Sequence, residues 1–142
     1  MQDRINNHKY FLNIAKAISE KSTCIRHKVG CLIIDNDNTI LATGYNGAPR
    51  GDAHCIDMGC IRDIKNINSG KNHEVCRAIH AEQNAIINAA RKGTAIKDGI
   101  CYCTHKPCII CLKMLINAGI KEVHYTNDYN SDDYNIININ NI

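Results

Sequence analysis

The most informative feature of this chain is His80-Ala81-Glu82, followed 25 residues after the glutamate by Pro107-Cys108-Ile109-Ile110-Cys111. Each of these two segments stands at the start of a helical pattern, and a β-rich run lies between the two patterns. A structural zinc site usually closes its coordination with four protein side chains, whereas a catalytic site leaves one position open for water. Three ligands, His80, Cys108 and Cys111, with Glu82 as a nearby acid are what metal-activated hydrolysis requires.

A second interpretation of the same residues is a structural zinc site or a redox pair, because Cys-x-x-Cys alone is typical of both. Both halves, however, occur once each and in this order. Pro107 suits the start of a helix because its missing N–H would be unpaired there. Helix N-termini carry positive potential, which favours thiolate over thiol. The pattern therefore favours two helix starts that converge on one catalytic ion, with an inactive descendant as a further alternative.

The alternation of helical and β-rich segments predicts an α/β protein. Apolar residues at helical spacing predict helices over 6–20, 81–91 and 107–118, the last two ending at Gly93 and Gly119. Strands are expected over 29–35 and 39–45, joined as a hairpin, and over 99–104, 122–125 and 136–139. Residues 47–78 are expected to form an ordered loop without regular elements. Strands that alternate with helices late in the chain indicate parallel pairing and a sheet covered on both faces.

The composition is that of an ordinary globular protein. The chain has 142 residues, of which 44% are hydrophobic and 22% charged, and this fits one domain over residues 1–142. No apolar run approaches the roughly 20 residues of a membrane span, and the polar start does not resemble a signal peptide. We therefore expect a protein of the cytoplasm, or of the host cytoplasm if it is viral. A net charge of +3 does not by itself indicate nucleic-acid binding.

Nine cysteines without a secretion signal indicate thiols and metal ligands rather than disulfides. Three of them stand within apolar runs and are interpreted as small buried hydrophobic residues: Cys31, Cys101 and Cys103. A second, structural zinc site is predicted in the long loop, because a metal would hold such a loop in one conformation. Its expected ligands are Cys24, Cys55, His73 and Cys76, with Cys60 or His54 as a replacement for one of them. The alternative is a metal-free insertion with free thiols.

Beyond the zinc motif, the chain resembles the cytidine and deoxycytidylate deaminase superfamily, and more narrowly the deoxycytidylate (dCMP) deaminases of bacterial and viral type. The resemblance covers roughly residues 8–130. It rests on four stretches: Gly44-Tyr45-Asn46-Gly47-Ala48-Pro49-Arg50-Gly51, His80-Ala81-Glu82-Gln83-Asn84-Ala85-Ile86, the Pro107–Cys111 motif and Ala118-Gly119-Ile120-Lys121-Glu122-Val123. The zinc motif is shared by many deaminases, whereas the glycine-rich stretch indicates dCMP.

The resemblance implies a three-layer α-β-α fold with a central mixed sheet of about five strands and helices on both faces. It also implies hydrolysis of dCMP to dUMP and ammonia, which supplies dUMP for thymidylate synthesis. His80, Cys108 and Cys111 would hold Zn²⁺ with water as fourth ligand. Glu82 would carry a proton from that water to ring N3 and to the departing amine.

Several residues are candidates for substrate contacts. Asn46 matches an asparagine that contacts the sugar in this superfamily, although Asn-Gly is also a common turn dipeptide. Arg50 and Arg91 are candidates for phosphate contacts, because guanidinium binds phosphate with two parallel hydrogen bonds. Tyr102 and Tyr125 are expected beside the pocket, although a strand tyrosine is more often a packing residue.

Regulation is also implied by the resemblance. Similar proteins are homohexamers that dCTP with Mg²⁺ activates and dTTP inhibits. The effector site is expected at Gly44, Tyr45, Asn46, Gly47 and Arg91.

Three other functions stay open on sequence grounds. A tRNA deaminase shares the zinc motif, but strand binding requires basic tracts and stacking aromatics, and this chain has one Phe and no Trp. A deaminase that also or mainly accepts dCTP is compatible with every motif. A non-enzymatic zinc-binding protein would not need Glu82.

Overall fold

A computed structural model of the protein describes residues 3–126 and 135–139. Its five strands form one sheet in the order β2-β1-β3-β4-β5. β1 pairs antiparallel with β2 and with β3, β3 pairs parallel with β4, and β4 pairs antiparallel with β5. The strands are β1 (Gly30–Ile34), β2 (Ile40–Tyr45), β3 (Ile100–Cys103), β4 (Glu122–Tyr125) and β5 (Asn135–Asn138). The sheet is therefore mixed, and parallel pairing occurs where a helix connects two strands, as expected.

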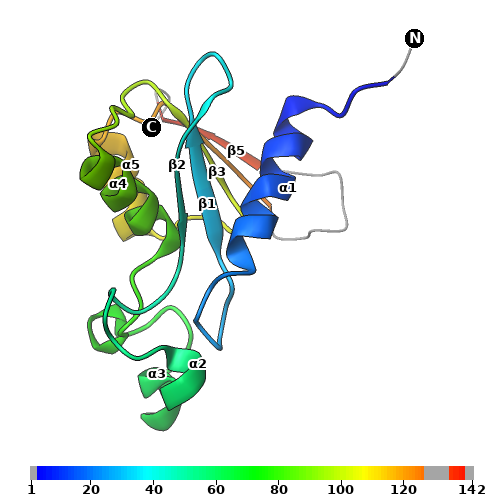
Figure 1. Ribbon diagram of the computed structural model, residues 1–142. Coiled ribbons are helices and arrows are strands. Elements are labelled where there is room, and N and C mark those ends of the chain that lie inside the picture. The colour runs from blue at the N-terminus through cyan, green and yellow to red at the C-terminus, as the bar shows by residue number, and fades with distance from the viewer. Residues whose placement is uncertain (1–2, 127–134, 140–142) are drawn as a thin grey trace.

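Helices cover both faces of this sheet (Figure 1). Helix α1 (Asn7–Ser19) lies on one face, and α4 (Ala81–Lys92) and α5 (Ile109–Asn117) lie on the other. The predicted three-layer α-β-α arrangement is confirmed, and the expected helices and strands are all present with ends that differ by at most two residues. Helix α4 ends at Gly93, whose φ of 68° is the left-handed conformation of a helix C-cap.

The two faces of the sheet have separate cores because side chains alternate along each strand. Cys31 and Ile33 of β1 pack with the buried alanines of α4, whereas Leu32 and Ile34 pack with Phe11 of α1. All five residues of β1 are buried. The same alternation in β3 decides which of its side chains can reach a site on the α4 side.

Gly44 allows α4 to approach the sheet closely. A Cβ at Gly44 would lie 2.2 Å from the carbonyl oxygen of Ala81 and 2.4 Å from the amide nitrogen of Ala85. Both atoms belong to the backbone of α4, so a side chain there would push the helix away from β2. This glycine therefore sets the position of the helix that carries His80 and Glu82.

Residues 47–79, which we call the roof, contain more regular structure than expected. The prediction of a loop without regular elements is wrong, because the roof contains α2 (Cys55–Met58), α3 (Ile61–Ile64) and the 3₁₀ helix η1 (His73–Val75). Elements of three or four residues are too short to give a hydrophobic period, which explains the error. The backbones of Gly47 and Ile79 exchange two hydrogen bonds and close the roof at its base.

The helices within residues 3–126 and 135–139 lack the length and apolar character that crossing a bilayer requires.

Candidate active site

Two helix N-termini on the same face of the sheet carry the motif residues. His80 is the N-cap of α4, and its backbone N–H donates a hydrogen bond to Oε1 of Gln83 at 3.0 Å. Cys108 is the N-cap of α5, and its sulfur accepts a hydrogen bond from the backbone N–H of Cys111 at 3.5 Å. Glu82 and Cys111 lie in the first turns of these helices. The helix starts therefore bring all four predicted residues to one place.

The imidazole and the two thiols converge closely enough to bind one ion. Nδ1 of His80 lies 3.2 Å from Sγ of Cys111 and 3.6 Å from Sγ of Cys108. Zinc holds nitrogen at about 2.0–2.1 Å and sulfur at about 2.3 Å, so tetrahedral N and S ligand atoms lie about 3.6 Å apart. The donor atoms fit this requirement. Burial and the charges of Glu82 and Cys108 raise the pKa of the Cys111 thiol well above its ordinary value, and a bound cation would favour its thiolate.

Glu82 lies beside these donors without being one of them. Its side chain is only 4% exposed. Burial raises the pKa of Glu82 from 4.5 to about 7, and hydrogen bonds from its own backbone and from the Cys111 and Cys103 thiols act in the opposite direction. A carboxyl group with a pKa near 7 can both accept and donate a proton at neutral pH.

A cavity of about 230 Å³ opens above this group. Its floor includes His80, Glu82 and Cys108, and Asn46 forms part of its wall. Glu82 is the only carboxylate among the described residues that line it. Most of the other lining residues come from the roof and from the loop before β1, so the cavity lies between the sheet and the roof.

The sequence model of the family described as "Cytidine and deoxycytidylate deaminase zinc-binding region" matches residues 5–127. The chain belongs to this family. The family's zinc-binding function agrees with the donor set at His80, Cys108 and Cys111, which we identify as the candidate metal site.

Similar proteins include enzymes of nucleotide metabolism. The chain is 38% identical over 125 residues to a deoxycytidylate deaminase of Schizosaccharomyces pombe, and 38% identical over 132 residues to ComE operon protein 2 of Bacillus subtilis. These matches cover 88% and 93% of the chain, which spans only 38% and 65% of the two relatives. The crystal structure of a cyanophage S-TIM5 dCMP deaminase in complex with dCMP and dUMP is 33% identical, with a TM-score of 0.71. That match covers 87% of this chain and 83% of the phage protein.

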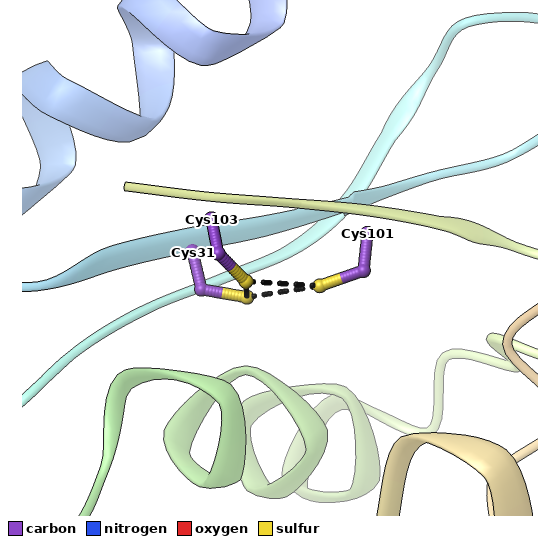
Figure 2. Close-up of side chains that lie close together, drawn as sticks. All are labelled: Cys31, Cys101 and Cys103. Carbon is purple, nitrogen blue, oxygen red and sulfur yellow. Dashed lines mark hydrogen bonds between the residues drawn. The ribbon is translucent and has the colours of Figure 1, made fainter. Parts of the chain in front are cut away.

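Three further thiols lie directly beneath the family's zinc-binding motif. Figure 2 shows the side chains of Cys31, Cys101 and Cys103, which extend from β1 and β3 on the α4 side of the sheet. Their sulfur atoms lie 3.3 to 3.6 Å apart and are completely buried. These three sulfurs also lie close enough together to hold a metal ion, but none of the three cysteines is among the described residues that line the cavity. They are buried, as predicted, and form an apolar layer against Glu82.

Asn46 lies in the cavity wall rather than in a tight turn. Its Oδ1 accepts a hydrogen bond from the backbone N–H of Val29 at 2.9 Å, and its Nδ2 donates one to the carbonyl of His27 at 2.8 Å. The Ser22 hydroxyl also donates to Oδ1, at 2.5 Å. Asn46 therefore fixes the loop before β1 at the edge of the cavity.

The predicted pocket tyrosines lie elsewhere. Tyr102 is 1% exposed and packs in the core beneath α1, on the opposite face of the sheet from Glu82. Its hydroxyl lies 2.9 Å from Nδ1 of His8. The structure thus contradicts the expectation for Tyr102, because strand alternation directs it away from the cavity. Tyr125 packs against the core on the α4 side and is not one of the described residues that line the cavity.

The predicted phosphate ligands also lie outside this cavity. Arg50 donates a hydrogen bond to Asn88 Oδ1 at 2.8 Å, and together with Arg91 it lines a separate cavity of about 510 Å³. Of the expected effector residues, Tyr45 and Gly47 line a third cavity of about 160 Å³. Gly44 is buried against α4, so packing explains why this position has no side chain.

The predicted second metal set is close together but not assembled. Cys24, Cys60, His73 and Cys76 all line the main cavity. Within the described part of the chain, no three ligand atoms of this set lie within 4.8 Å of one another. The ring of His73 instead packs edge-to-face against His80, with centroids 5.1 Å apart.

Two arginines that line the cavity, Arg26 and Arg62, were not predicted from the sequence. Arg62 is only 7% exposed, although arginine is usually a surface residue. No local pattern distinguishes it, because its burial depends on how the roof folds over the sheet.

Proposed function

We propose that this protein catalyses the hydrolytic deamination of dCMP to dUMP and ammonia. The observation that carries the proposal is a buried carboxyl group, Glu82, with a pKa of about 7, beside three converging metal donors on a cavity floor. A structural metal site has no use for such a group. The similarity to a phage dCMP deaminase that binds dCMP and dUMP supports this choice of substrate.

His80, Cys108 and Cys111 would hold zinc, which lowers the pKa of a bound water to about 7 and polarises the reacting group. Glu82 accepts a proton from the attacking water and delivers it to N3 of the cytosine ring. It then takes the second proton from the hydroxyl group now on C4 and donates it to the exocyclic amine. The C4–N bond breaks, ammonia leaves and the C4 carbonyl of the uracil ring forms, so that one water is consumed. The buried thiols beneath Glu82 keep bulk water from that side of the carboxyl group. This desolvation outweighs the opposing thiol hydrogen bonds and sustains the raised pKa. Asn46, in the cavity wall, is our candidate for the contact to the deoxyribose.

The experiment that tests this proposal measures conversion of dCMP by zinc-loaded protein, with Glu82→Gln as the inactive control. We expect dUMP from the parent protein and a rate at least about 10²–10⁴-fold lower from the variant, because a proton carrier typically contributes that much. The variant should retain its zinc and its circular dichroism spectrum. Equal rates would exclude the role of Glu82, and the absence of dUMP would exclude dCMP as substrate. Conversion of dCTP to dUTP, or deamination of tRNA alone, would identify one of the alternative substrates instead.

We also propose that dCTP with Mg²⁺ activates the enzyme and that dTTP inhibits it. The cavities that contain Tyr45, Gly47, Arg50 and Arg91 support this idea, because they are separate from the catalytic floor. Arginines there would pair with the phosphates of a triphosphate. Sigmoidal dCMP kinetics that become hyperbolic with dCTP, together with light scattering of a homohexamer, are the expected results. Kinetics that neither triphosphate changes would contradict the proposal.

A second zinc ion at Cys24, Cys55, His73 and Cys76 remains our proposal for the roof. What supports it is proximity, because the charges of the Cys24, Cys60 and Cys76 thiols act on the Cys55 thiol; burial raises the pKa of Cys55, and Arg77 opposes this shift. The ligand atoms would have to move closer than they lie in this structure. Two zinc ions per chain, falling to one in Cys55→Ser, are expected, and one per chain in the parent protein would overturn the proposal. We also propose that the protein acts in the cytoplasm, where its nine free cysteines would stay reduced.

A further inference from the structure

Three cysteines that take no part in the candidate zinc site form a compact sulfur cluster in the core (Figure 2). Sγ of Cys31 lies 3.3 Å from Sγ of Cys101 and 3.6 Å from Sγ of Cys103, and the last two sulfurs lie 3.5 Å apart. Cys31 of β1 is paired with Cys103 of β3, and Cys101 stands two positions away on the same face of β3. Two adjacent, hydrogen-bonded strands therefore hold three donors within reach of one ion.

The donors of this cluster are sulfur atoms alone. Within the described part of the chain the three cysteines are one of two groups whose ligand atoms lie close enough to hold a metal ion, and the other is the candidate zinc site. No histidine or carboxylate of the described residues joins the cysteine group. Thiolates select soft, thiophilic elements over hard cations. The cluster therefore suits an element that three sulfurs satisfy.

The surroundings of the cluster indicate the charge that such an element must carry. The three side chains are completely buried and pack in the core with Ile33 and Ala85, where an uncompensated charge is strongly disfavoured. Three thiolates bring three negative charges. Zn²⁺ would leave one of them unbalanced, and structural zinc takes a fourth protein ligand as well. A trivalent element balances all three charges and needs no further ligand.

We propose that Cys31, Cys101 and Cys103 form a binding site for trivalent arsenic. Its form in neutral water is arsenous acid, As(OH)₃, which has no net charge and so carries none into the core. Each thiol replaces one hydroxide: three As–S bonds form, three As–O bonds break, and the three thiol protons leave with the hydroxides as three waters. Arsenic stays trivalent, so no oxidant or reductant is required. The product has no net charge, as its apolar surroundings require.

The test measures arsenic that stays bound to zinc-loaded protein after incubation with arsenite and dialysis. We expect X-ray absorption to show an arsenic atom with three sulfur neighbours and no oxygen. Cys101→Val removes one donor and keeps an apolar residue suited to a strand, and it should bind one arsenic fewer per chain than the parent protein. Cys60→Val is the matched control, because Cys60 is also buried but belongs to the roof, and it should bind as much arsenic as the parent.

Several results would overturn the proposal. Equal arsenic in Cys101→Val and in the parent protein would show that the three thiols only pack the core. A loss in Cys60→Val alone would place the arsenic in the roof instead. If Cys101→Val does not fold, Cys31→Ala takes its place with the same expected loss of one arsenic per chain.

The burial of the thiols calls for one addition to this experiment. Arsenous acid reaches them only when the structure opens locally, so binding to the folded protein is slow. If the incubated parent protein holds no arsenic, the measurement is repeated after refolding from urea with zinc and arsenite present. No arsenic in the refolded parent protein would overturn the proposal. None of these measurements uses turnover, so the result is independent of the proposed deamination of dCMP.

Discussion

Replacing Glu82 with glutamine is expected to stabilise the zinc-free protein at neutral and alkaline pH. Burial raises the pKa of Glu82 from 4.5 to about 7, so between these values the folded protein binds a proton that the unfolded chain has released. The contribution of this group to stability is therefore complete below pH 4.5 and is lost as the pH rises through 7. At about 1.36 kcal/mol per pKa unit, the difference amounts to roughly 3 kcal/mol at pH 8.

The measurement is urea unfolding followed by circular dichroism, with a chelator present and at one protein concentration. At about pH 4 the free energies of unfolding of the parent protein and of Glu82→Gln should agree within about 1 kcal/mol, because both side chains are neutral in the folded state. At about pH 8 the variant should be more stable by about 2–3 kcal/mol. Glu20→Gln is the matched control, since Glu20 is exposed, and it should change stability by less than about 0.5 kcal/mol at either pH. A parent protein as stable as Glu82→Gln at the higher pH would refute the reasoning.

Three further predictions concern the metal site and the core. His80→Ala should lower the zinc content by one ion per chain and abolish turnover, and unchanged zinc measured by atomic absorption would contradict the assignment. Gly44→Ala should reduce the free energy of unfolding by about 1–3 kcal/mol and lower kcat as well, because α4 moves with His80 and Glu82; a variant with parental stability in urea would show that the helix has room. Tyr102→Phe should lose about 1 kcal/mol of stability and keep kcat/KM for dCMP within about twofold. A tenfold loss in that variant would restore Tyr102 as a substrate contact.

The catalytic residues could be predicted because their signal is local. His80 and Glu82 stand two positions apart at the start of a helix, and Cys108 and Cys111 stand three apart at the start of the next. Helix α4 connects β2 to β3, and α5 connects β3 to β4. Both connections run in the same direction along the sheet, so crossovers of the same hand place both helices on one face. The zinc donor set therefore followed from spacing and topology together.

The positions of Tyr102, of Arg62 and of the roof could not be predicted, because they depend on contacts between residues that are far apart in the sequence. Strand alternation shows that Tyr102 faces away from Cys101 and Cys103, but it does not show which face carries α4. Arg62 looks like a surface arginine, and its burial depends on the carbonyl of Asn68 and on the roof above the cavity. The short helices α2 and α3 have no periodicity of their own, so a structured roof could not be predicted from the pattern of apolar residues.

The hydrogen-bonded base of the roof has a consequence for how this protein can change over evolution. Gly47 and Ile79 bring the two ends of the roof together beside the start of α4, so its interior can be lengthened, shortened or exchanged while its attachment points stay fixed. Loop closure entropy costs only about 0.6 kcal/mol more when such a segment doubles in length. Selection can therefore alter which ligands the roof recognises, while the residues for proton transfer beneath it are inherited unchanged.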